Sequence, residues 1–408
     1  MTKPAVSPAT LACLKDLERQ VLWHACWMIH NANHLREKGE VKVGGHQASS
    51  ASLAAIMTAL YFHVLRPEDR VAVKPHASPV FHGIQSWMGN QTREKRENFR
   101  GFAGPQSYPS RAKDIDDVDF STGSVGLGVA ITAFASIVQD YIAAKQWSKR
   151  PEGRMIALVG DAELDEGNIY ECLQEGWKHD LRNTWWVIDY NRQSLDGVVR
   201  EGLWQRIEGI FTAFGWDVKV LKYGALQEAA FTEPGGKALR GWIDRCPNQL
   251  YSALTFQGGA AWRKRLTDEI GTEPGVAALL AARNDDALSN LMNNLGGHCL
   301  ETLIRTFESI DHDRPTVFLA YTIKGWGTPL AGHKDNHAGL MTKAQMETFQ
   351  TRIGVRPGEE WEKFGAIPSP QPAREFLKTV PFFAEGPRRF KSPALPASGP
   401  VFLEDREL

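Results

Sequence analysis

Residues 154–193 read RMIALVGDAELDEGNIYECLQEGWKHDLRNTWWVIDYNRQ, and this stretch decides the fold. It opens with an apolar run that ends in glycine, continues with a helical pattern over 168–179, and closes with a second apolar run over 184–191. This order predicts two parallel strands joined by a right-handed crossover. Apolar runs at 216–221 and 315–323 predict two more strands. We therefore expect an α/β fold with a mostly parallel sheet and helices on both faces.

Further segments have the pattern of helices. Residues 10–38 and 49–65 carry apolar side chains at helical spacing. After Asp119, a glycine-rich entry leads into a long run of small and apolar residues, which predicts a helix buried in the core. A helix around 287–310 is expected before the last strand. Past Val355 the sequence becomes irregular and holds nine of the 22 prolines, so we expect one domain over 1–355 and a proline-rich linker or tail over 356–408.

Composition excludes several classes of protein. Lys plus Arg is 47 against Asp plus Glu 48, a formal net charge of -1, so no basic field exists to recruit nucleic acid or an anionic membrane. The five cysteines are scattered and form no CxxC pair, which argues against a disulfide framework and a structural zinc site. The N-terminus lacks an apolar core of signal-peptide length, and no uninterrupted apolar run approaches a membrane span. A cytoplasmic protein is expected.

Polar residues follow the two strands of the opening stretch. Gly160 and Asp161 come after the first strand, and Asn191 follows the second, 30 residues beyond Asp161. The crossover places Asp161 and Asn191 side by side at one edge of the sheet, where ligands bind in open parallel sheets. Their hard oxygen atoms suit Mg²⁺ with diphosphate and water completing the shell. The structural alternative is that Gly160-Asp161 caps a helix and Asn191 begins a turn.

The chain resembles a known family over residues 10–355. The stretch GDAELDEGNIYECLQEGWKHDLRNTWWVIDYNRQSLDG is similar to the thiamine diphosphate fingerprint, in the version seen in the homodimeric pyruvate dehydrogenase decarboxylating components of the transketolase-like superfamily. The motifs GGHQASSASLAAI, PHASPVFHGI, NFRGFAGPQSYP, STGSVGLGVA, EGIFTAFGWDV and RPTVFLAYTIKGWGTP occur in the family's order. The resemblance implies a thiamine-diphosphate-binding fold and its diphosphate-binding domain.

The resemblance also implies the cofactors and their ligands. Mg²⁺ would be held by side-chain oxygens of Asp161 and Asn191 and by the main-chain carbonyl of Gln193. Thiamine diphosphate would be contacted by seven positions, which are Gly160, Ala162, Glu163, Asp189, Ser124, Gly126 and Ser78. The family has glycine where this chain has Ala162, which is tolerable in a helical conformation and strained in a left-handed one. The family tends to carry a histidine at Ser110, which leaves the contact there open.

Three histidines match the substrate side of the family's site. His46 lies in GGHQAS, His76 in PHASP and His337 in DNHAG, each in a loop. We expect them to be catalytic, through proton transfer to and from the carbonyl oxygen of the substrate and its adduct and through orientation of that oxygen. Trp185 and Trp186 lie in an apolar strand and are expected in the core. Lys324, at the end of a strand, is expected to face solvent or a carboxylate.

The family's activating glutamate belongs to a pyrimidine-binding domain that follows this one in full-length relatives, and nothing in the chain matches that domain or the C-terminal one. The resemblance therefore implies one wall of an active site, an oligomer, and a partner subunit that supplies the other wall. The expected function is that of a 2-oxo acid dehydrogenase acting on a pyruvate-like substrate. The alternatives are a transketolase subunit acting on a ketose, and a cofactor-binding or regulatory subunit without turnover.

Overall fold

The computed structural model describes residues 6–37, 43–123, 125–194 and 197–384. Its main sheet has five parallel strands in the order β1-β2-β3-β7-β6. The strands are β1 (Arg70–Ala72), β2 (Met155–Gly160), β3 (Thr184–Tyr190), β6 (Asp217–Leu221) and β7 (Thr316–Tyr321). The four strands predicted from apolar runs are confirmed. The short β1 was not predicted.

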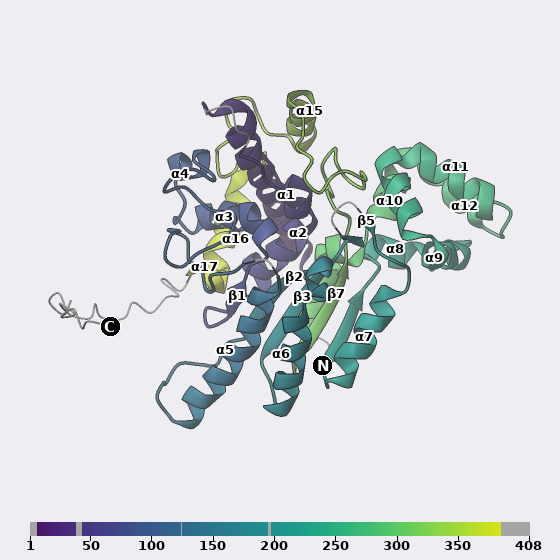
Figure 1. Ribbon diagram of the computed structural model, residues 1–408. Helices are drawn as coiled ribbons and strands as arrows, with labels where there is room; N and C mark the ends of the chain where they lie inside the picture. Colours follow the sequence, from purple (N-terminus) through teal and green to yellow (C-terminus); the bar gives the residue numbers. More distant parts are fainter. Residues whose placement is uncertain (1–5, 38–42, 124, 195–196, 385–408) are drawn as a thin grey trace, which may run out of the picture.

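Helices cover both faces of the sheet, as expected for the α/β class (Figure 1). On one face, α5 (Leu127–Ala144), α6 (Gly167–Lys178) and α7 (Leu203–Ala213) pack on Trp186 and Ile188. On the other, α1 (Pro8–His30), α2 (Gln47–Ala59), α3 (Ser78–Trp87) and α14 (Leu300–Glu308) pack on Trp185 and Val187. Successive strand residues point to opposite faces, so the adjacent tryptophans enter different halves of the core, where both are buried as predicted.

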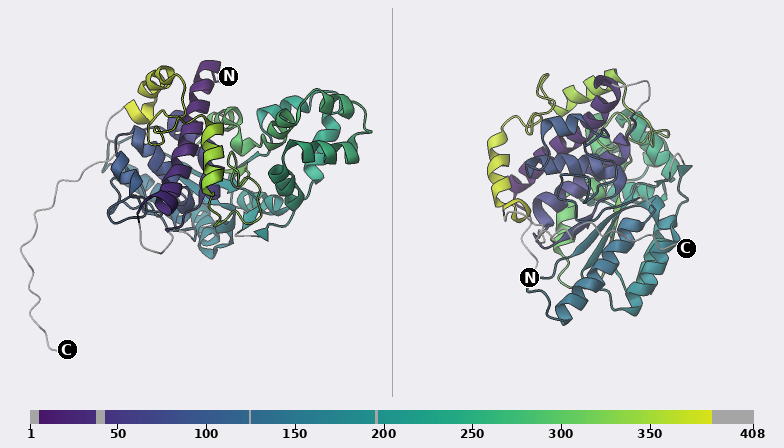
Figure 2. Two further views of the ribbon diagram at one scale, coloured as in Figure 1. Left: turned by 90° about the horizontal axis from the view of Figure 1, so that it is seen from above. Right: turned by 60° about the vertical axis from the view of Figure 1, so that its left-hand side comes forward.

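A helical group is inserted between β6 and β7. It comprises α8 (Ala225–Ala230), α9 (Gly236–Arg245), α10 (Asn248–Gln257), α11 (Gly259–Ile270), α12 (Val276–Ala281) and α13 (Asp285–Asn293). Figures 1 and 2 show α9, α11 and α12 projecting at one end of the molecule. The helix expected over 287–310 is divided, because residues 296–298 form a 3-10 turn between α13 and α14. The predicted N-terminal helices are shorter, since 31–35 and 60–64 are π-helical turns.

The segment after Val355 is folded as far as the structure describes it. Helices α15 (Lys343–Ile353), α16 (Pro370–Thr379) and α17 (Pro381–Ala384) follow the sheet, and Ala373, Val380 and Phe382 are buried in the cluster that contains α1. The carbonyl of Glu360 accepts a hydrogen bond from the Trp23 indole at 2.8 Å. Residues 356–384 therefore pack against the domain, and the predicted boundary at 355 stays a prediction. Residues 385–408 lie outside the described part.

Helix α5 differs from the prediction. Only Val129, Thr132, Ala133 and Ser136 of α5 are buried, so the expectation of a helix buried in the core is wrong for this chain. Among the described residues it is the one helix long and apolar enough to cross a membrane by length and composition. Its buried side is nevertheless part of the core, because the Trp186 indole donates to the Thr132 hydroxyl at 3.1 Å. The apolar composition indicated burial without indicating what covers the helix.

Candidate active site

The parallel strands bring the predicted metal ligands together. Gly160 at the end of β2 is aligned with Asp189 in β3, so Asp161 and Asn191 follow at the same edge of the sheet. The backbone N–H of Arg192 donates to the Asp161 carboxylate at 2.7 Å. The crossover inferred from the strand, helix, strand pattern is therefore the feature that joins residues 30 positions apart in sequence.

The turn after β3 has an unusual backbone. Arg192 has a φ of 66°, a left-handed conformation that costs a non-glycine residue roughly 1–2 kcal/mol. Its guanidinium lies 5.1 Å from the ring centre of Tyr251 and 5.7 Å from that of Tyr321, and it donates to the Thr322 carbonyl. These contacts offset the strain. The left-handed conformation is what directs the Arg192 N–H at Asp161.

The oxygen atoms at this edge fit a hard divalent cation. The Asn191 side-chain oxygen accepts one bond, from the Gln193 N–H at 3.0 Å. The Gln193 side-chain oxygen is buried and has no hydrogen-bond partner among the described residues. Burial and the neighbouring Asp189 raise the pKa of Asp161 to about 7. A bound cation would reverse that effect by stabilising the carboxylate. The donors are oxygen atoms that Mg²⁺ accepts, so the residues present fit the metal.

A buried lysine lies among these carboxylates. The Lys74 ammonium is 3.0 Å from the Asp189 carboxylate, and both side chains are inaccessible to solvent or nearly so. Burial lowers the pKa of Lys74, but the charges of Asp189, Glu163 and Asp161 outweigh burial and raise it above its ordinary value. Lys74 was not predicted as a site residue from the sequence. Its position directly after the apolar run of β1, before the PHASP motif, was the available signal.

Asp189 lies behind the cavity and does not line it. Its carboxylate accepts hydrogen bonds from the Ser52 and Thr322 hydroxyls in addition to Lys74, and it is fully buried. Burial opposes ionisation, but these partners outweigh it and lower the pKa of Asp189. The Asn191 amide also lies 3.3 Å from this carboxylate. The geometry makes Asp189 a group that positions Lys74 and Asn191, and its contact with the cofactor stays a prediction.

Glu163 and its neighbours form one wall. Burial raises the pKa of Glu163, while Lys74 and the backbone N–H groups of Gly160 and Gly126 act in the opposite direction. Gly126 has a φ of 74° and begins α5. Ala162 lies in the 3-10 turn Asp161–Asp165 and is not among the residues with positive φ. The methyl group of Ala162 therefore introduces none of the strain that a left-handed conformation would bring.

The three predicted histidines converge from separate loops. The ring centres of His46 and His76 are 3.8 Å apart, and His337 lies 5.3 Å and 5.7 Å from them respectively. Burial, helped by neighbouring positive charges, lowers the pKa of His46 to about 4 and that of His76 to about 2. Both rings are therefore neutral at pH 7. Neutral imidazole both donates and accepts a hydrogen bond, as proton exchange requires.

Lys324 is part of the site, contrary to the expectation that it faces solvent or a carboxylate. It is 3% exposed, and its ammonium lies 2.9 Å from Nδ1 of His337. The lysine is part of the motif TIKGWGTP, but its position after β7 does not by itself indicate which way its side chain points. The strand order places β7 beside β3, which brings Lys324 to the same edge of the sheet as Asn191.

Most of these side chains line one cavity of about 250 Å³, here called the sheet-edge cavity. Its lining comprises Ser49, Lys74, Pro75, His76, Val125, Gly160, Asp161, Ala162, Glu163, Glu166, Asn191, Gln193, Lys324 and His337. The predicted site residues outside this lining are His46, Ser78, Gly126 and Asp189, and Ser124 lies outside the described residues. Ser49 and Glu166 line the cavity and were not predicted. A diphosphate with its cation fits a cavity of this size and chemistry.

Comparisons with known proteins agree with this arrangement. Residues 42–230 match the family described as the transketolase thiamine diphosphate binding domain. The chain is 27% identical over 366 residues to the pyruvate dehydrogenase E1 component of Cupriavidus necator, covering 86% of this chain and 40% of that protein. It is 26% identical over 418 residues to the E1 component of Escherichia coli, covering 98% and 46%. These matches support membership of the thiamine-diphosphate-dependent transketolase-like superfamily.

Solved structures bear out the fold of this transketolase-like chain. Transketolase from Campylobacter jejuni superposes with a TM-score of 0.59 at 17% identity, covering 91% of this chain and 46% of that one. Transketolase from Leishmania mexicana gives 0.54 at 16% identity, covering 90% and 47%. At such identities the likeness concerns the fold. The chain spans less than half the length of these relatives and of the E1 components above.

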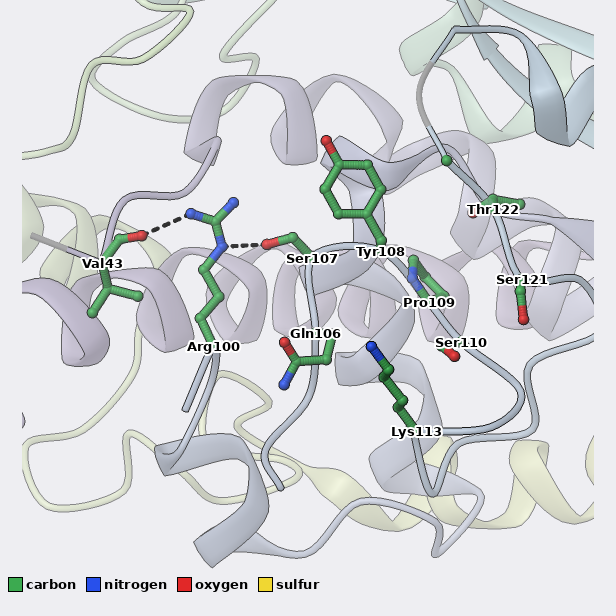
Figure 3. Close-up of a pocket in the computed structure, with 11 residues that line it drawn as sticks. Val43, Arg100, Gln106, Ser107, Tyr108, Pro109, Ser110, Lys113, Ser121 and Thr122 are labelled. Atoms are coloured by element: carbon green, nitrogen blue, oxygen red, sulfur yellow. Dashed lines mark hydrogen bonds between the residues drawn. The ribbon is translucent and has the colours of Figure 1, made fainter. Parts of the chain in front are cut away.

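A second cavity of the transketolase-like chain borders the same loops. This loop cavity, of about 840 Å³, is lined by Val43, Arg100, Ser110, Lys113 and Gly123 among others (Figure 3). The Arg100 guanidinium donates to the Val43 carbonyl at 2.8 Å and to the Ser107 hydroxyl. Ser110, where the family tends to carry a histidine, lines the loop cavity and not the sheet-edge cavity.

Proposed function

We propose that this chain supplies the magnesium- and diphosphate-binding wall of a thiamine-diphosphate active site that decarboxylates a pyruvate-like 2-oxo acid. The observation that carries the proposal is the sheet-edge cavity, in which oxygen donors of Asp161, Asn191 and Gln193 line the same hollow as His76, His337 and Lys324. The names of the relatives that match most of the chain, pyruvate dehydrogenase E1 components, support the choice of substrate class.

The cofactor, when bound, supplies a nucleophilic carbon and an acceptor for the electrons left by decarboxylation. The protein's own part begins with binding. Asp161, Asn191 and the Gln193 main chain would hold Mg²⁺, and the metal with the Lys74 ammonium would offset the diphosphate charge. The backbone N–H groups of Gly160 and Gly126 donate to Glu163. These contacts hold Glu163 in the wall of the cavity against which the diphosphate would lie.

On the substrate side, the neutral histidines would act on the carbonyl oxygen. His46 and His76 stack with ring centres 3.8 Å apart, so a proton held at one ring is near the other. Lys324 contacts Nδ1 of His337 and would supply a positive charge beside that ring. Together they would orient the carbonyl oxygen and exchange its proton, which is the work of general acid and base groups.

We further propose that another subunit covers the open side of the sheet-edge cavity. Val125 lines the cavity and is 46% exposed, and it continues into an apolar stripe along α5. The stripe consists of Leu127, Ile131, Phe134, Val138 and Tyr141, each at least 40% exposed. Its alternating spacing of four and three residues is that of helices that pack against a partner helix. Covering this stripe would also exclude water from the reacting groups.

A cytoplasmic location without membrane or nucleic-acid partners completes the proposal. All five cysteines are free thiols, which suits a reducing compartment. With a net charge of -1, the chain has no overall positive field that would attract a polyanion such as nucleic acid.

The test is calorimetry followed by an activity survey. The 408-residue chain should bind thiamine diphosphate weakly and only with Mg²⁺, and should turn over no 2-oxo acid until a partner carrying the pyrimidine-binding domain is added. A set of 2-oxo acids and ketose phosphates then separates dehydrogenase from transketolase. Full decarboxylase activity of the purified chain alone would refute the two-subunit proposal. Tight binding without any turnover in the complex would favour the non-catalytic alternative.

A further inference from the structure

A third cavity, of about 810 Å³, lies between α4 (Arg93–Glu97), the segment 356–365 and the start of α16, and it shares no lining residue with the sheet-edge cavity. We call it the cationic cavity, because five basic side chains and two acidic ones line it. They are Arg93, Arg96, Arg356, Lys363 and Arg374 against Glu359 and Glu362. The local excess is three positive charges, whereas the whole chain carries a net charge of -1.

Arg96 is the buried basic residue of the cationic cavity. Its side chain is 3% exposed, it donates to the Trp361 carbonyl at 3.0 Å, and its guanidinium lies 5.6 Å from the Trp361 ring centre. Its Nε is buried and has no hydrogen-bond partner within the described ranges, nor does any described carboxylate lie within 4.0 Å of Arg96. Burial lowers the pKa of Arg96 to about 10. A buried cation with an unmet donor is unfavourable unless an anion reaches it.

Two further cations face the cavity without a carboxylate partner in the described part of the chain. Arg374 lies over the Phe364 ring at 4.4 Å, and neither Arg374 nor Lys363 forms an ion pair there. Burial, and then the charges of Arg96 and Arg374, lower the pKa of Lys363. By contrast, Arg93 pairs with Glu97 at 2.8 Å, so its charge is already balanced. Glu362 is the carboxylate that acts most strongly on Arg96, so one acidic neighbour faces three cations, and an anion between them would reduce their mutual repulsion.

We propose that the cationic cavity binds a small anion with two or more negative charges, such as a phosphate ester or a diphosphate. Guanidinium groups bind phosphate oxygens in pairs, and the volume is in the range of small-molecule sites. The segment that forms one side is fixed to α1, because the Gln20 side chain bonds the Glu362 carbonyl at 3.2 Å and the Ala366 N–H at 2.6 Å. An anion held by Arg96, Lys363 and Arg374 would join α4, this segment and α16.

The experiment is a calorimetric titration of inorganic pyrophosphate into the full chain, with a chelator present so that no divalent cation supports binding in the sheet-edge cavity. Wild-type protein should bind one equivalent. The K363Q/R374Q variant should lose at least about tenfold in affinity, since two charge-assisted contacts are removed. The single variant Arg374→Gln should lose about threefold and guards against a double variant that does not fold.

Two control variants show whether the pyrophosphate binds in the cationic cavity itself. Lys378→Gln removes an exposed charge from the same helix, where Lys378 pairs with Glu375 at 2.8 Å, and should leave the affinity unchanged. Lys113→Gln removes an exposed charge from the loop cavity and should also leave it unchanged. The proposal is overturned if wild-type protein does not bind, if R374Q and K363Q/R374Q bind as tightly as wild type, or if Lys378→Gln or Lys113→Gln weakens binding equally.

Discussion

The ammonium of Lys74 lies 3.0 Å from the carboxylate of Asp189, and the two groups form a buried ion pair in which Lys74 lines the sheet-edge cavity and Asp189 lies behind it. Asp189 belongs to β3 and Lys74 follows β1. Since β2 lies between these two strands, the ion pair connects β3 to the segment after β1 across β2. Its position next to Asp161 and Glu163 makes Lys74 the cation that offsets these acidic groups when no metal is bound.

The first prediction concerns this pair. Lys74→Gln should lower the free energy of unfolding by about 3–5 kcal/mol in metal-free protein, because Asp189 is left as a buried carboxylate without its cation. Urea denaturation followed by circular dichroism measures the loss. The double variant K74Q/D189N should recover part of it, since the fully buried Asp189 carboxylate is then replaced by a neutral amide. Equal losses in the single and double variants would show that the ion pair itself is not the cause.

The second prediction concerns the metal. Asp161→Ala should weaken magnesium-dependent binding of thiamine diphosphate by at least about tenfold, because a carboxylate ligand is lost. Calorimetry with and without Mg²⁺ measures the change. Glu171→Ala, an exposed carboxylate on α6, is the matched control and should bind as wild type does. Wild-type affinity in Asp161→Ala would remove Asp161 from the ligand set.

The third prediction concerns pH. Burial lowers the pKa of His46 to about 4 and that of His76 to about 2, whereas unfolded histidine titrates near about 6.5. Between pH 6.5 and 4 the unfolded chain therefore binds more protons than the folded chain, so stability falls as the pH falls. The urea midpoint should drop more steeply over this window in wild type than in H46Q/H76Q.

The control for the pH experiment is His179→Gln, which removes an exposed histidine at the end of α6 and should keep the wild-type slope. Parallel curves for wild type and H46Q/H76Q would contradict the neutral, partly buried state of the two rings.

The fourth prediction concerns α5. Phe134→Glu places a charge in the middle of the apolar stripe and should weaken subunit association by at least about tenfold, because a charge in an interface core must lose its hydration. Sedimentation with cofactor, Mg²⁺ and any partner present measures the effect. Phe256→Glu changes a similarly exposed ring on α10 and should have no effect on association. Unchanged association of the Phe134→Glu variant would exclude the stripe as the interface.

Much of the fold was predictable from local patterns. Residues 155–159 and 185–188 are apolar in uninterrupted runs, which is typical of strands covered on both sides. Helices α8–α12 of the insertion were missed, because they lie outside the sheet and carry short, mixed patterns between glycines. The burial of α5 was predicted wrongly, since apolar composition does not distinguish a core helix from one that packs on another chain.

In the site, residues that directly follow a strand or belong to a motif could be predicted from the sequence. Residues whose role depends on which way the side chain points could not. Asp161 and Asn191 could be paired because parallel strands end at one edge. Lys324 also ends a strand, but whether a lysine there turns toward solvent or toward His337 depends on neighbouring loops. Lys74 shows the same limitation, because a single lysine after a three-residue strand carries no periodic signal.

By itself, the sequence determined the parallel α/β architecture, the edge of the sheet that carries the chemistry, and the oxygen donors Asp161 and Asn191. These follow from hydrophobic periodicity and chain connectivity, which act over short stretches. Only the tertiary structure decided that His46, His76 and His337 meet, that Lys74 neutralises Asp189, and that Arg96 lies buried in a cavity with more basic than acidic side chains. Those relationships join segments far apart in the chain, and their energies depend on burial, which exists only once the core has formed.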